Sequence, residues 1–465
     1  YLNGKNGHRM MQKIAKNQWK PISDINEKEP QDGYDIISTI DVYIQDIAHH
    51  ALLKQLEYYT ADHGCVVVME TKTGHIKAIS NLGRAEDGSY YETQNYAITE
   101  SHEPGSTFKL VDLIAVLDDK KADTSTVYDS KGGVIEYFGR KVKDSKPGGY
   151  GKISLAKGFE VSSNTVLVQS VYNNYKNNPK QFVDRINSYG LNKPLGLPIK
   201  GEGKPIIPQP GTNRWSGVAL PWMAFGYGLS VTPLQTLTLY NAVANNGVMV
   251  KPIFVSEIKE WNKTIKKYNT EVINPKICTQ ETLNKVKAIL ENVVKKGTGS
   301  KLYSKDFSMA GKTGTAQVGY KDKSKMYYAS SFVGYFPANE PKYSCIIVVH
   351  KPNVAAGYYG ADVAGPVFKR IAQKIFTDSP STNHVKNIDA KLVSQENSYN
   401  SYYKKVEKET KIVPNVKGMD GMDALALLEN LGLKVKVIGM GRVKKQSLTS
   451  GQAFNKNQTI IIELS

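Results

Sequence analysis

Ser106 and Lys109 are a pair of residues that could do chemistry together, in the run PGSTFK that ends at Lys109. Proline and glycine end the preceding segment and an apolar pattern with helical spacing follows. The sequence therefore predicts Ser106 at a helix N-terminus and Lys109 one turn later on the same face. A serine hydroxyl needs a base to become a good nucleophile, and lysine is a base only when burial or a nearby cation lowers its pKa. The same spacing also occurs at 154–157 and 401–404, so alone it equally fits a helix cap.

A second pair, Ser162 and Asn164, comes from the run SSN. The two residues lie two positions apart, so a loop can aim both side chains into one cleft. There the asparagine would hydrogen-bond a substrate amide and the serine would pass a proton. The alternative is that this run only caps the helix that follows it.

The third group is the run GKTGT, inside a strand-like pattern. Lys312 would bring a cation to a substrate carboxylate and help keep Lys109 neutral. The hydroxyls of Thr313 and Thr315 would bind the same carboxylate. Gly314 would leave room for a ligand backbone to approach the strand.

Other chemistries fit this sequence poorly. A phosphate-binding loop needs a glycine five residues before Gly311, where the chain has Asp306. Cys65 and Cys345 lie in apolar runs typical of buried strands, and three cysteines are too few for a disulfide framework. No histidine is spaced with a cysteine as in a structural zinc site. We therefore expect no ATPase, no metal and no cofactor.

The elements that must position these groups follow from hydrophobic periodicity. Helical spacing occurs at 45–56, 108–117, 161–172, 234–244, 283–294 and 362–376. Strand patterns occur at 65–69, 75–80, 309–318, 329–336 and 343–350, and residues 105–250 are expected to be mainly helical. Two strands before a helical region and three after it predict an α+β domain whose antiparallel sheet is assembled from both ends of the segment.

Length and composition predict several units. The chain has 465 residues, of which 40% are hydrophobic, which excludes a largely disordered protein, a collagen-like repeat and a pure coiled coil. Residues 1–35 are polar and are expected to be the tail of an upstream domain. Residues 36–378 carry the three groups, residues 379–410 have the composition of a linker, and residues 411–465 form a small separate module.

The surface charge is strongly positive. Lysine and arginine number 61 against 43 aspartates and glutamates, a net charge of +18. Such a balance suits anionic partners such as nucleic acid, membrane headgroups or wall polymers, and it equally suits plain solubility. No stretch is apolar and long enough to cross a bilayer, and because the first residue is Tyr1 we expect an N-terminal anchor outside this chain.

Taken together, the three groups resemble a known family. Residues 36–378 resemble the transpeptidase domain of class B penicillin-binding proteins, through the runs TID, EPGSTFK, GYGLSVTPLQ and AGKTGTA. Residues 411–465 resemble one PASTA module, through VPNV, GM, GL and QS. The resemblance implies an α+β fold with a five-stranded antiparallel sheet flanked by helices, an all-helical subdomain, and a small α+β module after it.

The resemblance also implies a reaction. Ser106 would attack the carbonyl of the penultimate D-Ala in a peptidoglycan stem peptide, and Lys109 would take its proton. The amine of a neighbouring stem would then resolve the acyl-enzyme and close a cross-link. Backbone N–H groups of Ser106 and Thr315 would form the oxyanion hole.

The remaining site residues are carried over in the same way. Ser162 would relay a proton to the leaving amine and Asn164 would hold the stem amide. Lys312 would belong to the catalytic set and, with Thr313 and Thr315, would bind the terminal carboxylate. Gly314 would belong to the substrate-binding set. β-Lactam antibiotics would acylate Ser106 and stay bound.

Partners and location follow from the family as well. We expect peptidoglycan stem peptides as substrates, a septal role in cell division, and no nucleic acid partner. A membrane glycosyltransferase and divisome proteins would dock on the pedestal domain, of which residues 1–35 resemble the end. The protein would face the periplasm, held in the cytoplasmic membrane by its anchor, and the PASTA module would be a structural or partner-binding appendage.

Two other functions remain open at this point. The same serine could give its ester to water, as in a D,D-carboxypeptidase or a β-lactamase, which requires a group that activates water. The chain could also be a non-catalytic sensor of β-lactams or cell wall. A complete set of catalytic groups favours the transpeptidase.

Overall fold

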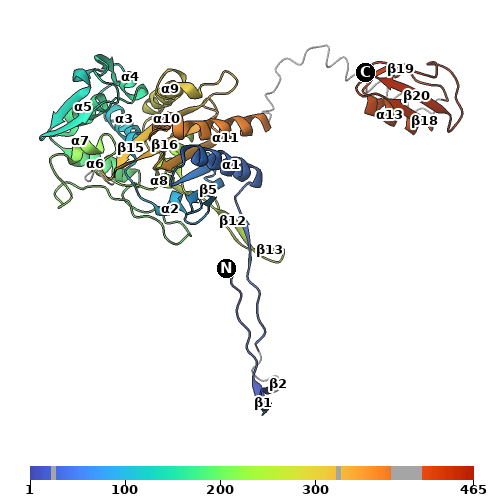
Figure 1. The fold of residues 1–465 in the computed structure, drawn as a ribbon, viewed down its shortest axis with the longest axis horizontal. Coiled ribbons are helices and arrows are strands. Elements are labelled where there is room, and N and C mark those ends of the chain that lie inside the picture. Colours follow the sequence, from blue (N-terminus) through green and yellow to red (C-terminus); the bar gives the residue numbers. More distant parts are fainter. Residues whose placement is uncertain (22–27, 321–325, 379–410) are drawn as a thin grey trace. The chain divides into compact units, whose positions relative to one another are not determined.

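The computed structural model describes residues 1–21, 28–320, 326–378 and 411–465 (Figure 1). Contacts divide the chain into two compact units, Tyr1–Pro380 and Ser381–Ser465. The predicted linker, 379–410, lies outside the described residues. Within the described residues, no helix combines the length and the hydropathy that a membrane span requires.

A six-stranded sheet in the order β15-β16-β17-β4-β5-β6 forms the centre of the first unit. Its strands are β4 (His63–Glu70), β5 (Ile76–Arg84), β6 (Tyr90–Tyr91), β15 (Ala310–Val318), β16 (Tyr327–Phe336) and β17 (Tyr343–His350). All neighbouring pairs are antiparallel. The predicted α+β fold is confirmed: five long strands come from both ends of the segment, and the two-residue β6 extends the sheet by one.

Alternation along the strands gives the sheet two buried faces. On β4, Cys65, Val67 and Met69 join the core beneath the helical region, whereas Val66 and Val68 join a second core. The second core packs against helices α1 (Val42–Tyr59) and α11 (Gly365–Asp378). Near-continuous apolar runs in the sequence are the consequence of this burial on both faces.

The helical region lies between β5 and β15 in the chain. Its longer helices are α3 (Lys109–Asp118), α4 (Leu155–Glu160), α5 (Asn164–Tyr175), α6 (Pro179–Ser188), α7 (Ala219–Met223), α8 (Pro233–Ala244) and α9 (Gln280–Lys296). Short strand pairs interrupt it: β7 (Val127–Asp129) with β10 (Lys152–Ser154), and β8 (Val134–Tyr137) with β9 (Arg140–Lys143). The sequence predicted a mainly helical region at 105–250 and did not predict these strand pairs.

Helix α8 joins the Ser106 segment to the sheet. Thr232 and Gln235 form a reciprocal capping box at its start. Farther along, Tyr240 donates its hydroxyl hydrogen to Thr107 O at 2.8 Å. Asn241 donates to Thr71 O at 3.0 Å and accepts from Ser344 Oγ at 2.7 Å. All three hydrogen bonds are buried, so α8 holds the segment that contains Ser106 at a fixed distance from the sheet.

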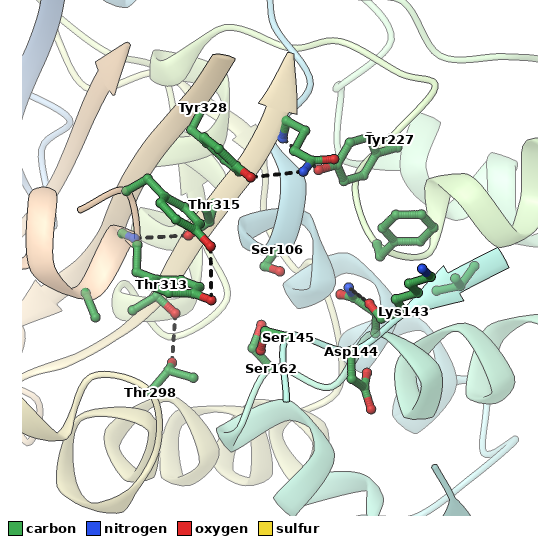
Figure 2. A pocket seen from close by; sticks show the side chains of 18 of the residues that line it. Ser106, Lys143, Asp144, Ser145, Ser162, Tyr227, Thr298, Thr313, Thr315 and Tyr328 are labelled. Carbon is green, nitrogen blue, oxygen red and sulfur yellow. Dashed lines mark hydrogen bonds between the residues drawn. The ribbon is translucent and has the colours of Figure 1, made fainter. Parts of the chain in front are cut away.

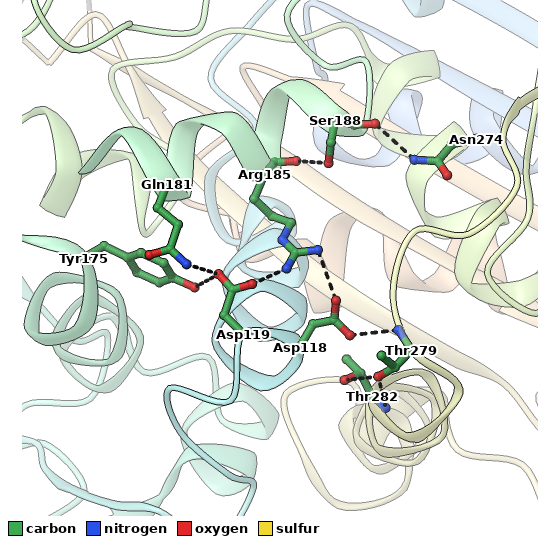
Figure 3. A network of polar contacts seen from close by, with 9 residues as sticks. All are labelled: Asp118, Asp119, Tyr175, Gln181, Arg185, Ser188, Asn274, Thr279 and Thr282. Carbon is green, nitrogen blue, oxygen red and sulfur yellow. Dashed lines mark hydrogen bonds and ion pairs between the residues drawn. The ribbon is translucent and has the colours of Figure 1, made fainter. Parts of the chain in front are cut away.

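An ionic network holds the other end of α3 (Figure 3). Arg185 on α6 pairs with Asp118 at 3.1 Å and with the neighbouring Asp119. Tyr175 donates to Asp119 at 2.7 Å, and Asp118 accepts from Thr279 N at 2.8 Å, at the N-cap of α9. Helices α5, α6 and α9, through Tyr175, Arg185 and Thr279, therefore all contact the C-terminal end of α3, the helix that carries Lys109.

The first residues of the chain pair mostly among themselves. Strands β1 (Met11–Ala15) and β2 (Gln18–Pro21) are antiparallel, and all of their residues are exposed to solvent. Strand β3 (Asp35–Ser38) instead joins β12 (Val255–Glu260), which pairs with β13 (Lys263–Lys267). The assignment of residues 1–35 to an upstream domain stays a prediction.

The second unit has its own core. Helix α13 (Gly421–Asn430) accompanies a three-stranded sheet of β18 (Lys434–Ile438), β20 (Thr459–Leu464) and β19 (Val443–Gln446). Leu428, Ile460 and Ile462 are fully buried in it. Near the start of this module a single bridge joins Ile412 to Ala453.

Candidate active site

A cavity of about 670 Å³ contains the predicted site residues that face solvent. The 3-10 turn η1 (Gly105–Phe108), the α4–α5 connection and strand β15 each contribute to its wall. Its lining includes Ser106, Ser162, Asn164, Thr313 and Thr315, and Figure 2 shows Ser106, Ser162 and the two threonines around one space. Three groups that are far apart in sequence therefore meet in one place.

Ser106 lies on η1, directly before α3, as the sequence predicted. Gly105 has a φ of +55°, and the Cβ of Ala316 lies 3.1 Å from where a side chain at Gly105 would begin. The turn is thereby pressed against β15 with room only for glycine. Ser106 is partly exposed, and its hydroxyl has no hydrogen-bond partner among the described residues. The hydroxyl is therefore available to a ligand in the cavity.

Lys109 is fully buried and its amine is surrounded by acceptors. Nζ donates to Ser162 O at 2.8 Å, to Asn164 Oδ1 at 2.6 Å and to Ser162 Oγ at 3.2 Å. No direct hydrogen bond joins it to Ser106 in the described part of the chain, although Ser106 lies on the turn that leads into α3 and Lys109 is the first residue of that helix. Catalytic hydrogen bonds are often loose without substrate and tighten when it binds.

Burial lowers the pKa of Lys109 to about 7, against the weaker opposing effects of Asp144 and Asp112. About half of these amines are then neutral at pH 7. Desolvation is the main cause of this shift; the sequence argument had named burial or a nearby cation, and had expected Lys312 to help. Asp112 does not reverse the shift, because its own burial raises the pKa of its carboxyl well above the usual range.

Ser162 joins the two amines. Its backbone has a φ of +57°, in the left-handed region, and its Oγ accepts from Lys312 Nζ at 2.8 Å as well as from Lys109. The N-cap of α5 is the next residue, Ser163, whose Oγ accepts from Val166 N at 3.2 Å. The residue that caps the helix is therefore Ser163, and the side chain of Ser162 is not used for capping. Such a backbone conformation is costly and is typical of functional positions.

Lys312 is as buried as Lys109. Besides Ser162 it donates to Thr313 O at 3.0 Å. Burial and the neighbouring amine of Lys109 lower its pKa well below the ordinary value. Two amines that share one hydroxyl in a place of low dielectric cannot both carry a charge at low cost.

Both ends of the Asn164 amide are engaged. Oδ1 accepts from Lys109, and Nδ2 donates to Lys143 O at 2.7 Å. Asp144 holds the start of this helix, since it accepts from Ser163 Oγ at 3.1 Å and from Thr165 N at 2.9 Å. Sequence reasoning missed Asp144, because no periodicity or motif marks it.

Strand β15 presents two hydroxyls to the cavity. Thr313 Oγ1 lies 2.7 Å from Thr298 Oγ1, and Thr315 Oγ1 accepts from Gly360 N at 3.0 Å. Between them, a Cβ on Gly314 would collide with Ser331 Oγ and lie 2.9 Å from Thr107 Cγ2. The space beside Gly314 is therefore filled by the protein itself, and the expected approach of a ligand backbone there stays a prediction.

Aromatic rings form a second wall that sequence reasoning did not assign to the site. Tyr227 accepts from Gln317 N at 2.8 Å, which ties its loop to β15. Tyr328 and Tyr358 stack with centroids 4.1 Å apart. The only sequence signal was Tyr227 itself, within the GYGLSVTPLQ run that supported the family resemblance.

The sequence also matches known families. Residues 64–373 match the family described as the penicillin binding protein transpeptidase domain, and residues 411–465 match the PASTA domain. The chain therefore belongs to the penicillin-binding protein transpeptidases and carries a C-terminal PASTA domain, as the resemblance had suggested.

Individual relatives agree with this assignment. The chain is 28% identical to stage V sporulation protein D of Bacillus subtilis, over 100% of this chain and 70% of that protein. It is 27% identical to the peptidoglycan D,D-transpeptidase FtsI of Escherichia coli K12, over 80% of this chain and 60% of that protein. The solved transpeptidase domain of Burkholderia pseudomallei penicillin-binding protein 3 superposes with a TM-score of 0.62 at 25% identity, over 75% of this chain and 97% of that domain.

Proposed function

We propose that this protein is a serine D,D-transpeptidase of the class B type, which cross-links peptidoglycan stem peptides during cell-wall synthesis. The observation that carries the proposal is a free serine hydroxyl, Ser106, facing a cavity in which two buried lysines share the hydroxyl of Ser162. Relatives named as peptidoglycan D,D-transpeptidases support the substrate class.

The first half-reaction forms an ester. Ser106 Oγ attacks the carbonyl carbon of the penultimate D-Ala while its proton passes to neutral Lys109. The C–N bond to the terminal D-Ala then breaks, and the departing amine receives a proton through Ser162. Backbone N–H groups of Ser106 and Thr315 stabilise the oxyanion, each worth about 3–4 kcal/mol of barrier.

The second half-reaction closes the cross-link. The amine of a neighbouring stem attacks the ester carbonyl, and Ser106 leaves with its proton restored. Asn164 holds the stem amide through the N–H and the lone pair that its two present contacts leave unused. Thr313 and Thr315 bind the terminal carboxylate of the donor through the hydroxyls that they present to the cavity, while Lys312 lies buried behind them and Gly314 packs against Ser331.

Acylation by a β-lactam tests the nucleophile. After incubation with benzylpenicillin, intact mass spectrometry should show one stable adduct on the parent chain and none on Ser106→Ala. Ser188→Ala is the matched control, because Ser188 is an exposed serine on α6 whose Oγ only donates to Arg185 O. An adduct that persists on Ser106→Ala would remove Ser106 from its role, and no adduct on the parent would favour the sensor.

A product assay separates the transpeptidase from the hydrolases. A synthetic D-Ala-D-Ala peptide is offered with an amine acceptor, and the aminolysis and hydrolysis products are counted. We expect aminolysis to dominate as the acceptor is raised. Hydrolysis alone would identify a carboxypeptidase, and rapid release of penicilloate would identify a β-lactamase.

We further propose a septal role at the outer face of the cytoplasmic membrane, with an anchor supplied by a segment upstream of this chain. Supporting this are the relative named FtsI and the PASTA domain. A membrane glycosyltransferase and divisome proteins are the expected partners. A fluorescent fusion of the full-length protein should gather at division sites, and an even distribution along the cell wall would contradict the septal role.

A further inference from the structure

A cluster of metal-binding side chains lies where the sheet meets the segment that leads into Ser106. His63 begins β4 and His350 ends β17, and the two residues are direct partners in the antiparallel register. Glu100 comes from the segment just before η1 and reaches both rings. None of the three has a role in the proposed reaction.

The distances within the cluster suit one ion. Glu100 Oε2 lies 2.9 Å from His63 Nε2 and 3.7 Å from His350 Nε2, and one donor atom from each residue lies within 4.8 Å of the others. Ligands at about 2.0–2.1 Å from a tetrahedral zinc ion are about 3.3 Å from each other. The separations of 2.9 and 3.7 Å lie on either side of that value, and an ion would replace the hydrogen bond that now joins His63 and Glu100.

His350 provides an independent observation. Its side chain is only 3% exposed, and neither ring nitrogen is within hydrogen-bond distance of a partner among the described residues. Nδ1 has no partner at all, and Nε2 only approaches Glu100 at 3.7 Å. Buried polar atoms are nearly always paired, and this ring makes no hydrogen bond within the described residues, so Nε2, the nitrogen that faces Glu100, is available to a ligand, while Nδ1 on the other side of the ring would stay unpaired.

The surroundings match those of a histidine ligand. Asp62 Oδ2 lies 2.9 Å from Nδ1 of His63, on the side of the ring opposite Glu100. A carboxylate behind a metal-binding histidine fixes its tautomer and raises its basicity. Two imidazoles and one carboxylate are a donor set that suits zinc.

We propose that His63, Glu100 and His350 bind one divalent metal ion of the zinc class, with water in the fourth position. The two rings stack at 4.4 Å with planes 11° apart, so one ring turns about χ2 to bring both lone pairs to the ion. The ion then clamps the segment that enters the nucleophile turn onto the ends of two central strands. Sequence analysis expects no metal, because these ligands come from positions too far apart for any spacing rule.

Zinc binding by the full chain tests this inference without reference to catalysis. Protein stripped with EDTA is titrated with zinc chloride in competition with a chelating dye. We expect one ion per chain, bound at least 10-fold more weakly by Glu100→Gln and by His350→Gln. His50→Gln is the matched control, since His50 is an exposed histidine beside Asp46, and it should bind like the parent.

Equal affinity in the parent and both cluster variants, or no binding by the parent, would overturn the site. If a variant does not fold, crystals of the parent soaked in zinc chloride decide the matter. An anomalous peak at the zinc edge between His63 Nε2 and Glu100 supports the proposal, and a peak only at other positions refutes it. The outcome is independent of whether Ser106 is the nucleophile.

Discussion

The amine of Lys109 lies among three oxygen acceptors in a place without bulk water. Hydrogen bonds that the amine donates to three acceptors would by themselves favour its charged form, yet burial lowers its pKa to about 7. The enzyme thus obtains a neutral amine near physiological pH without needing a positive neighbour. Ser162 and Asn164 hold that amine in place.

This pKa predicts the pH dependence of acylation. Only neutral Lys109 can accept the proton of Ser106, so the rate of acylation by benzylpenicillin should rise about tenfold per pH unit below pH 7 and level off above it. Stopped-flow measurement of acylation checks the profile. Lys109→Gln should slow acylation about 10²–10⁴-fold and remove the inflection. Lys285→Gln, at an exposed ion pair on α9, should keep it, and a parent rate that is flat across pH 7 would refute the assignment.

Gly314 is predicted to be intolerant of even one extra methyl group. In Gly314→Ala the new Cβ would meet Ser331 Oγ and Thr107 Cγ2, so η1 and β15 must separate. Overpacking of this kind costs about 1–3 kcal/mol in the free energy of unfolding, and it should slow acylation because η1 carries Ser106. Urea unfolding and acylation kinetics measure the two effects.

A second substitution distinguishes crowding from a lost ligand contact. Ser331→Ala removes the nearest colliding atom, so Gly314→Ala combined with Ser331→Ala should recover part of the stability and rate. If the double variant is no better than Gly314→Ala alone, the collision is not the cause.

How much of the site the sequence could predict depends on the kind of signal. Ser106 and Lys109 are marked by their spacing at the start of an apolar helix, and Lys312 by the KTG run within a strand pattern; the structure brings all three to one place. Asp144 and Thr298 act through contacts across the fold, which no local pattern records. The pairing of Lys109 with Ser162 rather than with Ser106 depends on a single left-handed residue, which the sequence does not reveal.

At the level of elements, the helix that carries Lys109 is held at its far end by α6. Arg185→Leu would leave the carboxylates of Asp118 and Asp119, both 9% exposed, without their cation. We expect a loss of about 3 kcal/mol in the free energy of unfolding, at the lower end of the range for buried pairs because Arg185 is 25% exposed.

A matched control lies on the same helix. Lys180 pairs with Asp184 at an exposed position, and Lys180→Leu should cost no more than about 0.5 kcal/mol. Urea unfolding of both variants gives the comparison. Similar losses from the two substitutions would show that burial of the carboxylates does not matter.

The elements predicted well are those with long apolar patterns. The five long strands and helices α1, α3, α8 and α9 lie where periodicity put them. Helix α5 begins at Asn164 and not at 161, because Ser162 leaves the helical region of φ. The expected helix at 362–376 is two helices, since α10 (Gly360–Val363) ends before α11 begins. The pair β8–β9 was missed because its residues are mostly exposed and lack alternation.

For the whole molecule, the two units have separate hydrophobic cores, and every lining residue of the cavity belongs to the first. A chain that ends at residue 380 should therefore be acylated by benzylpenicillin within about twofold of the parent rate, since nothing in the cavity is removed. Stopped-flow kinetics on both chains measure this. A large loss of rate in a truncated chain that still unfolds cooperatively would mean that the PASTA unit supports the site.

The hydroxyl of Ser162 bridges amines that come from a helix and from the central sheet, and this bridge survives only while water is kept out. A motion that separated the helix from the sheet would let water reach Lys109. Its pKa would then return toward 10.5, and the amine would be protonated at pH 7. A protein in which helix and sheet had separated would thus lose the neutral amine that accepts the proton of Ser106, and Ser106 would not react with other carbonyl compounds. The close packing of helix against sheet therefore also sets the protonation state of Lys109.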